Sequence, residues 1–140
     1  MPLWSIHHSP GLYTAEDKRN FANDVTGIYT RIGLPPFYVV VAFHEVDPEN
    51  LFVGGESTDA AVRVVIEHIA RHTEAPEDRR RIGDTITRVV APYTTDRGLH
   101  TEFHVDETPR DLWMINGMWP PPAGSDGEKL WAEENATVPY

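Results

Sequence analysis

Ala15-Glu16-Asp17-Lys18-Arg19 in the first half of the chain has a close counterpart in the second half, Pro76-Glu77-Asp78-Arg79-Arg80. Two further pairs of segments follow in the same order: Phe43-His44 with Phe103-His104, and Leu51-Phe52 with Leu112-Trp113. The second half of the chain therefore repeats the first. Because such a repeat is one supersecondary unit used twice, the elements of the first half are expected twice in the fold.

The first half has the pattern of a β-α-β unit. Leu3 to His8 predicts a short strand. A helix is predicted from Ala15 to Ile32, because Thr14 can cap its start with Asp17 three residues later. Phe37 to Glu45 is a nearly continuous apolar run, which is typical of a strand buried on both faces. The apolar stripe of the helix is Phe21, Val25, Ile28 and Ile32.

The second half predicts the same three elements. Val62 to Ile69 indicates a strand, Pro76 stands in the first turn of a helix, and Leu99 to Val105 indicates the last strand. The core stripe of this helix is Ile82, Ile86 and Val89. Parallel strands need a crossover connection, and crossovers are right-handed, so both helices are expected on one face of one sheet. The predicted fold class is α/β (α+β): two fused β-α-β units that form a four-stranded sheet.

We expect one domain over residues 1–140, with repeat one at about 1–61, repeat two at about 62–115 and a C-terminal tail at about 116–140. The second and fourth strands are too apolar to face water, so the uncovered face of the sheet is expected to be buried in an oligomer. The tail is rich in Trp and Pro and is expected to wrap a neighbouring surface. Packing against a partner subunit is the expectation for Trp113, Met114, Met118 and Trp119.

Composition argues against several kinds of partner. The chain has 12 Lys and Arg against 22 Asp and Glu, and its net charge of −10 repels nucleic acids and anionic lipids. Without cysteine it has no thiolate nucleophile and no cysteine metal site. Neither a secretory signal nor an apolar run of membrane-spanning length occurs. We therefore expect a cytoplasmic protein with no nucleic-acid partner and no membrane partner.

Met1-Pro2 points to a catalytic amine. Methionine before proline is normally excised in cells, because proline is small, and excision would leave Pro2 with a free secondary amine. An α-amine titrates at about 8, and burial or a nearby cation lowers that pKa, so the amine could carry protons at neutral pH. The alternative is that Pro2 only begins a strand. If Met1 stays, the Pro2 nitrogen is an amide and carries no proton.

Two histidine pairs have a spacing of four residues, His68 with His72 and His100 with His104. On a helix this spacing can chelate a metal, but on a strand residues four apart are separated by about 13 Å. Both pairs fall largely in predicted strands. We therefore expect no metal site and no cofactor.

These features together resemble the tautomerase superfamily, and its branch around cis-3-chloroacrylic acid dehalogenase, which has fused β-α-β repeats. The resemblance rests on Met1-Pro2 at the start of the first unit, on the arginine after the third strand, and on the Trp- and Pro-rich tail. It extends through Thr14, the segment Asn50-Leu51-Phe52-Val53-Gly54-Gly55, and Glu107-Thr108-Pro109. It implies a tautomerase-like fold, a homotrimer, and a small carboxylic acid as substrate.

The resemblance also implies the site. Pro2 would be the catalytic amine, and Arg71 would clamp the substrate carboxylate with its planar fork. Without the resemblance, Arg71 would be expected to form a surface ion pair with Glu67 or Glu74. Tyr29 stands at the position of a family histidine and could donate a hydrogen bond to a carboxylate.

His104 stands at the position of a family tyrosine, as another donor and a proton shuttle. The chain differs from the dehalogenases of the family at two positions that the resemblance implies are needed for dehalogenation. Glu74 replaces the second arginine of the family, and Ile115 replaces the glutamate that activates water, so efficient dehalogenation is not expected. Asn116 follows Ile115 and could orient a carbonyl or a water, but it cannot deprotonate one.

Three functions are consistent with the sequence. The first is an enzyme that tautomerises or hydrates a small unsaturated or keto carboxylic acid with Pro2 as proton carrier. The second is a non-catalytic, ferredoxin-like ligand-binding or assembly domain, which shares the β-α-β-β-α-β order. The third is a dimeric α+β barrel oxygenase or isomerase that uses His44 or His104.

Overall fold

A four-stranded sheet forms the centre of the computed structural model, which describes residues 1–140. Its strands are β1 (Pro2–His8), β2 (Val40–Glu45), β5 (Ala61–Ile69) and β6 (His100–Thr108), in the order β2-β1-β5-β6. β1 pairs parallel to β2, β5 pairs parallel to β6, and the two central strands β1 and β5 are antiparallel. The predicted fold class is confirmed, because each repeat supplies one parallel pair and the two pairs join through their first strands.

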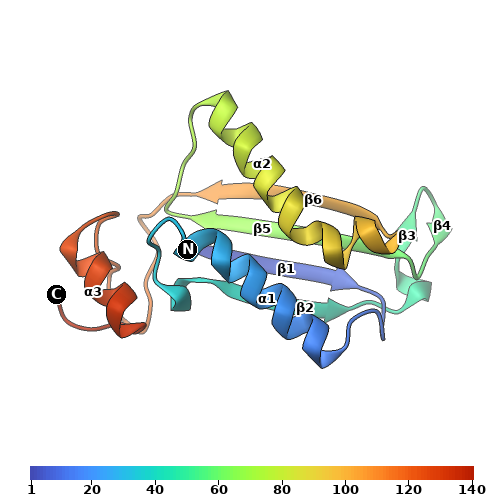
Figure 1. Ribbon diagram of the computed structural model, residues 1–140, viewed down its shortest axis with the longest axis horizontal. Helices are drawn as coiled ribbons and strands as arrows, with labels where there is room; N and C mark the ends of the chain where they lie inside the picture. The colour runs from blue at the N-terminus through green and yellow to red at the C-terminus, as the bar shows by residue number, and fades with distance from the viewer.

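Two helices, α1 (Ala15–Thr30) and α2 (Pro76–Val90), lie across the same face of the sheet (Figure 1). The capping box at the start of α1 is formed: the Asp17 N–H donates to Thr14 Oγ1, and the Thr14 N–H donates to Asp17 Oδ2, both at 3.0 Å. α1 ends two residues before the predicted Ile32, because Gly33 turns the chain with a φ of 86°. Ile32 is consequently exposed rather than part of the core stripe.

The other boundaries differ in small ways from the prediction. The second strand begins at Val40 rather than Phe37, because Pro36–Tyr38 forms a 3-10 turn, which suits prolines better than a strand interior. The linker between the repeats contains a 3-10 turn (Pro48–Asn50) and a two-residue hairpin, β3 (Phe52–Val53) and β4 (Glu56–Ser57). Two further 3-10 turns, Ala91–Tyr93 and Thr95–Arg97, connect α2 to β6.

The core lies between the sheet and the two helices. β1 contributes Trp4 and Ile6, and β5 contributes Val62, Val64 and Ile66, all essentially inaccessible to solvent. These residues alternate along their strands because successive side chains of a strand point to opposite faces. The helices cover them with Phe21, Val25, Ile86 and Val90.

The tail packs on its own chain, and of the four residues expected to pack against a partner subunit, Trp113 is instead buried within the chain. Helix α3 (Asp126–Glu134) lies beside the end of the sheet at which β1 begins (Figure 1). Trp131 is fully buried, and Trp113 is also part of the core, with its ring centroid 5.2 Å from that of Tyr38. Met114 and Trp119 are exposed, and Met118 is partly buried against the core.

The uncovered face of the sheet is more polar than predicted. The apolar residues of β2 and β6 that suggested a buried face, Val41, Phe43, Phe103 and Val105, are in register with buried residues of β1 and β5 and so point toward the helices. The opposite face carries His44 of β2, Arg63 of β5 and His104 of β6. His44 stacks on His7 of β1, with ring centroids 4.9 Å apart. None of the helices combines the length and the apolar character that crossing a membrane requires.

Candidate active site

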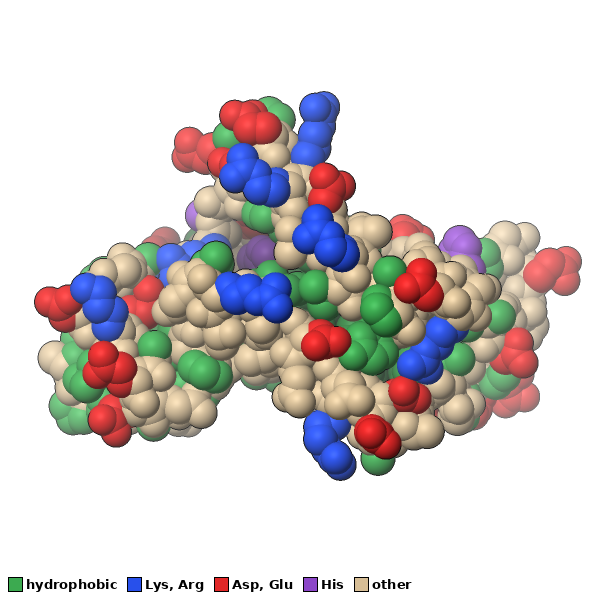
Figure 2. Space-filling view, viewed as in Figure 1, with side chains coloured by type: hydrophobic (Ala, Val, Ile, Leu, Met, Phe, Trp, Pro, Cys, Tyr) green, Lys and Arg blue, Asp and Glu red, His purple; other side chains and the backbone are tan.

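A cavity of about 660 Å³ opens at the end of the sheet where β1 begins and β5 ends. Its walls come from the last turn of α1, the first three turns of α2 and the loop that joins β5 to α2. The surface is hollowed there, below the projecting start of α2 (Figure 2). Eight of the 17 lining residues are hydrophobic, among them Ile28, Leu34 and Ile82. Most of the others carry polar side chains, and these decide what the cavity can bind.

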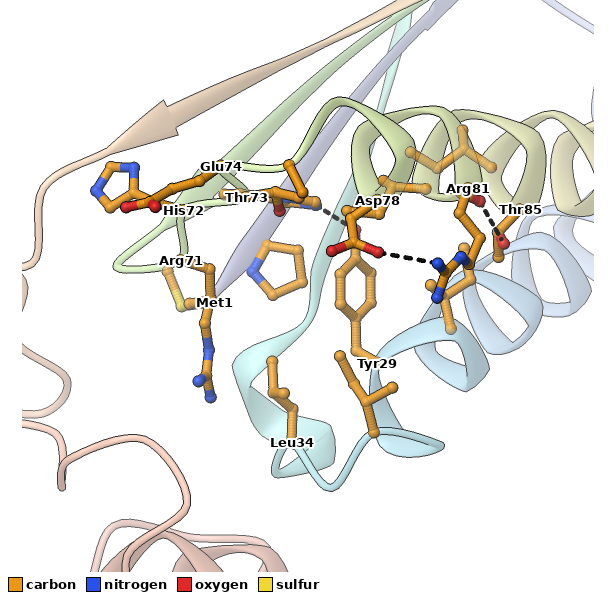
Figure 3. A pocket seen from close by; sticks show the side chains of 17 residues that line it. Met1, Tyr29, Leu34, Arg71, His72, Thr73, Glu74, Asp78, Arg81 and Thr85 are labelled. Atoms are coloured by element: carbon orange, nitrogen blue, oxygen red, sulfur yellow. Dashed lines mark hydrogen bonds and ion pairs between the residues drawn. The ribbon is translucent and has the colours of Figure 1, made fainter.

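The chain terminus lies in the wall of this cavity (Figure 3). The Met1 amine donates a hydrogen bond to the Ile69 carbonyl oxygen at 2.6 Å, and the Ile69 N–H donates to the Met1 carbonyl oxygen at 2.8 Å. Burial lowers the pKa of the Met1 amine from 8.0 to about 5, with the positive charge of Arg71 acting in the same direction and Glu128 opposing it. An amine at this place is thus largely neutral at pH 7.

Pro2 also lines the cavity, directly opposite His68 in the antiparallel pairing of β1 with β5. While Met1 is attached, the Pro2 nitrogen is an amide. Removal of Met1 would give Pro2 the terminal amine, opposite His68 in the strand pairing.

Arg71 follows β5, after a left-handed turn at Ala70 with a φ of 63°. Its guanidinium Nη2 lies 2.8 Å from Glu128 Oε1 of α3, not from Glu67 or Glu74. The Glu128 side chain is only 8% exposed, and its other oxygen accepts a hydrogen bond from the Gly124 N–H at 2.7 Å. Because Arg71 remains 36% exposed at the cavity wall, its other nitrogens can still receive a carboxylate.

Tyr29 reaches the cavity from α1 (Figure 3). The Trp4 indole N–H donates to its hydroxyl at 2.9 Å, and the same hydroxyl lies 2.8 Å from His68 Nε2. Burial raises the pKa of the Tyr29 hydroxyl and lowers that of His68. Sequence reasoning considered His68 only as half of a metal pair and missed it as a site residue. The only signal for it was the register of β1 against β5, which the sequence does not reveal.

Two predicted site residues lie away from the cavity. His104 is on the opposite face of the sheet, where its Nδ1 is 2.7 Å from Arg63 Nη2 and its Nε2 is 3.2 Å from Asp106. Asn116 sits in a tight turn, with a φ of 51°, and donates a hydrogen bond to Thr137 Oγ1 at 3.3 Å. The chain therefore brings together Pro2, Arg71 and Tyr29, but neither His104 nor Asn116.

The remaining charges at the rim are largely paired. Asp78 Oδ1 lies 3.1 Å from Arg81 Nη2 one turn along α2, and Glu107 accepts a hydrogen bond from the Thr73 N–H at 3.1 Å. No group of three or more His, Asp or Glu side chains is placed to hold a metal ion. The arrangement offers a buried amine, one cation with free donors and a tyrosine–histidine pair, and these groups can bind an anion and move a proton.

Residues 1–136 match the profile of a protein family described as "Putative oxalocrotonate tautomerase enzyme". Among solved structures, native RhCC from Rhodococcus jostii RHA1 shares 41% identical residues, with 99% of each chain covered and a TM-score of 0.95. A protein described as a probable enzyme from the thermophilic fungus Aspergillus fumigatus is also 41% identical, covering 100% of this chain and 98% of that chain with a TM-score of 0.94.

A more distant structure is N1, a member of the cis-3-chloroacrylic acid dehalogenase family. It is 20% identical, covers 95% of this chain and 97% of its own, and has a TM-score of 0.74, so it shows a shared fold. None of the curated proteins compared with the chain matches it.

Proposed function

Since this chain belongs to the tautomerase superfamily, as its sequence indicated, we propose that it is an enzyme whose proton carrier is the amine of Pro2 after removal of Met1. Its substrate would be a small unsaturated or keto carboxylic acid, and its reaction tautomerisation or hydration. The observation that carries the proposal is the cavity that holds the chain terminus, Pro2 and Arg71 together.

Each wall of the cavity has a part in this reaction. The substrate carboxylate binds the free guanidinium nitrogens of Arg71, and the carbon chain lies against the hydrophobic residues from α1 and α2. The Pro2 amine, in its protonated form, then delivers a proton to the unsaturated carbon. Desolvation lowers the pKa of the Met1 amine at this end of the sheet, and similar burial of a Pro2 amine would make its protonated form a stronger acid.

Efficient dehalogenation is not part of the proposal. Attack by water needs a base, and Ile115 replaces the water-activating glutamate of the dehalogenases, while Glu74 replaces an arginine. With cis-3-chloroacrylate we expect chloride release far below that of a true dehalogenase, measured with a chloride-sensitive assay. A comparable rate would contradict this part of the proposal.

We also propose a homotrimer. A fused 4-OT with the same fold is described as an asymmetric trimer, at 18% identity and a TM-score of 0.66 over 84% of this chain and 94% of that one. The sheet face opposite the helices is uncovered in the single chain, and burial of its four strands in an assembly would shield their polar network from water.

The amine can be tested by replacing Pro2. Protein whose loss of Met1 has been verified by intact mass would be assayed with phenylenolpyruvate as the enol acid. Pro2→Ala should strongly reduce kcat, because a primary amine of altered basicity replaces the secondary one. Pro48→Ala is the matched control, since Pro48 is exposed and lies by the hairpin at the other end of the sheet. Unchanged kinetics in Pro2→Ala would rule out the amine mechanism and favour a binding module.

A further inference from the structure

The hydrogen bonds of the Tyr29 hydroxyl can be assigned donor by donor. A tyrosine hydroxyl has one proton to donate and two lone pairs to accept, whereas the tryptophan indole nitrogen can only donate. One lone pair of Tyr29 therefore accepts the Trp4 N–H. The Tyr29 proton then has one place to go, His68 Nε2 at 2.8 Å. We assign His68 as the acceptor of this bond, because the Tyr29 proton has no other acceptor in the chain; the His68 Nε2 is then unprotonated and its proton sits on Nδ1.

The surroundings of His68 favour this neutral form. Desolvation is the main cause that lowers its pKa, and the nearby terminal amine acts in the same direction, while Glu107 opposes them. The other titratable and charged groups around His68 come from every neighbouring element: the chain terminus, Tyr29 of α1, Arg71, His72 and Glu74 of the loop, Asp78, Arg79 and Arg81 of α2, and Glu107 of β6.

We propose that Tyr29 and His68 form a relay that takes up the proton leaving the substrate oxygen. The inference rests on the proposed function and supplies its missing proton acceptor. The second lone pair of the Tyr29 oxygen has no partner in the chain, and Tyr29 lines the cavity. A hydroxyl group of a ligand can donate to it.

The protons balance in one turnover of an enol acid. The enol O–H bond breaks and its proton passes to the Tyr29 oxygen, while the Tyr29 O–H proton passes to His68 Nε2. At the same time the protonated Pro2 amine gives its proton to the enol carbon, and the C=C–O–H group becomes HC–C=O. The enzyme ends with a neutral amine and a charged His68, and solvent returns the proton from His68 to the amine.

The relay also changes which ligand group Tyr29 recognises. The sequence suggested that Tyr29 donates to the substrate carboxylate. With His68 neutral, the Tyr29 proton is already engaged, so the tyrosine presents an acceptor to the cavity. A carboxylate is repelled by that oxygen and belongs at Arg71, while an enol hydroxyl or a water belongs at Tyr29. The cavity should therefore prefer acids that carry a hydroxyl group near the carboxylate.

Steady-state kinetics with phenylenolpyruvate on Met1-free protein would test the relay. Tyr29→Phe and His68→Gln should each lower kcat about a hundredfold with little change in KM, and the double variant should be no slower than either single one, because the two groups act as one unit. Tyr38→Phe and His100→Gln are matched controls. The Tyr38 hydroxyl is buried without a partner and lies outside the cavity, and His100 is exposed.

A pH profile separates a relay from a purely structural pair. Only neutral His68 can accept a proton, so the wild-type kcat should rise with pH through the lowered pKa of His68, and His68→Gln should lack this acidic limb. Nitrogen NMR of the resting protein should show His68 protonated on Nδ1 at neutral pH.

The outcomes distinguish this inference from the function on which it rests. A wild-type protein that does not turn over any enol acid would overturn both. Activity that depends on Pro2 but survives in Tyr29→Phe and His68→Gln would overturn the relay alone. The relay would also be overturned if His68→Gln had a lowered kcat but kept the acidic limb of the pH profile. A resting His68 protonated on Nε2 would overturn it as well. A lowered kcat in both variants, together with loss of the acidic limb in His68→Gln, would support the relay.

Discussion

At the scale of single residues, the charge of Arg71 is shared between two tasks. One nitrogen is held by Glu128, a buried carboxylate of the tail, while the side chain as a whole remains 36% exposed and lines the cavity. The same cation lowers the pKa of the terminal amine, and Glu128 raises it. A single ion pair thus links the proposed anion site, the terminal amine and the tail helix.

Arg71→Ala is expected to weaken carboxylate binding. Loss of a charge-assisted hydrogen bond costs about 1.5 to 3 kcal/mol, which corresponds to a roughly ten- to hundredfold increase in KM. The amine pKa should rise at the same time, because a nearby positive charge has been removed. Enzyme kinetics across pH measure both effects. The exposed Arg19 gives the control Arg19→Ala, and an unchanged KM in Arg71→Ala would show that the carboxylate binds elsewhere.

At the scale of elements, α1 and α3 are each held by a side-chain contact with a residue outside the helix. The first turn of α1 is linked to the loop after α2 by Arg97 Nη2, which lies 2.9 Å from Asp17 Oδ1. α3 is anchored by Trp131, whose indole N–H donates to the Val138 carbonyl oxygen at 2.6 Å. These contacts fix the two helices against the rest of the chain.

The Asp17 contact predicts a pH-dependent stability. Its hydrogen bond with Arg97, together with the cap at Thr14, lowers the pKa of Asp17 from 3.8 to about 2. A depressed pKa in the folded state means that the stabilisation is present above pH 3.8 and is lost as pH falls toward 2. Asp17→Asn should therefore lower the Tm at pH 7, and the difference from wild type should shrink below pH 3.8. Thermal unfolding monitored by circular dichroism at several pH values measures this difference in Tm.

Asp59→Asn is the control for loss of one carboxylate, because Asp59 is exposed and takes part in none of the ion pairs. It should leave the Tm almost unchanged at every pH. A Tm difference for Asp17→Asn that persists unchanged at pH 2 would mean that its charge is not responsible.

Trp131→Ala is expected to destabilise the whole fold. Truncation of a fully buried tryptophan leaves a large void and costs about 3 to 5 kcal/mol in the free energy of unfolding. Urea denaturation measures this loss. Leu112→Ala provides the control, because Leu112 is 97% exposed and its loss should change stability by less than about 0.5 kcal/mol. Wild-type stability in Trp131→Ala would show that α3 does not contribute to the core.

At the scale of the whole molecule, the two faces of the sheet have different roles. The helical face is covered by the core, and the cavity opens at one end of it. The other face carries histidines, Arg63 and a few apolar side chains such as Val65. Arg63 Nη1 lies 2.8 Å from Glu102 and Arg63 Nη2 lies 2.7 Å from His104 Nδ1, so this face is already organised as a network.

The proposed homotrimer makes this face an interface, and light scattering at micromolar concentration is the measurement. Wild-type protein should have the mass of three chains. Val65→Arg should shift the population toward monomers, because it adds an uncompensated charge to the centre of the face. The control Thr87→Arg, on the exposed side of α2, should leave the oligomeric state unchanged. A monodisperse wild-type monomer would contradict the proposal.

Local patterns determined most of the elements. Matching segments identified both repeats, and the Thr14 cap and Pro76 located the starts of their helices. The repeat and the right-handed crossovers predicted one sheet with two helices on the same face. Pro2 and Arg71 were expected at the site because of the resemblance to the tautomerase superfamily. The identity of the family also followed from short segments read in order.

Contacts between residues that are distant in the sequence could be identified only in the tertiary structure. The partner of Arg71 is Glu128, which lies in a helix that no repeat predicts, and the partner of Tyr29 is His68, which comes close through the pairing of β1 with β5. His104 was predicted for the site but faces away from it, because one step of register along β6 moves a side chain to the other face. The sequence alone determined the elements, since local propensity and periodicity depend on near neighbours, and Arg71 was expected in the site only through the family resemblance. Only the tertiary structure decided which polar groups meet, because strand register and helix docking depend on the whole core.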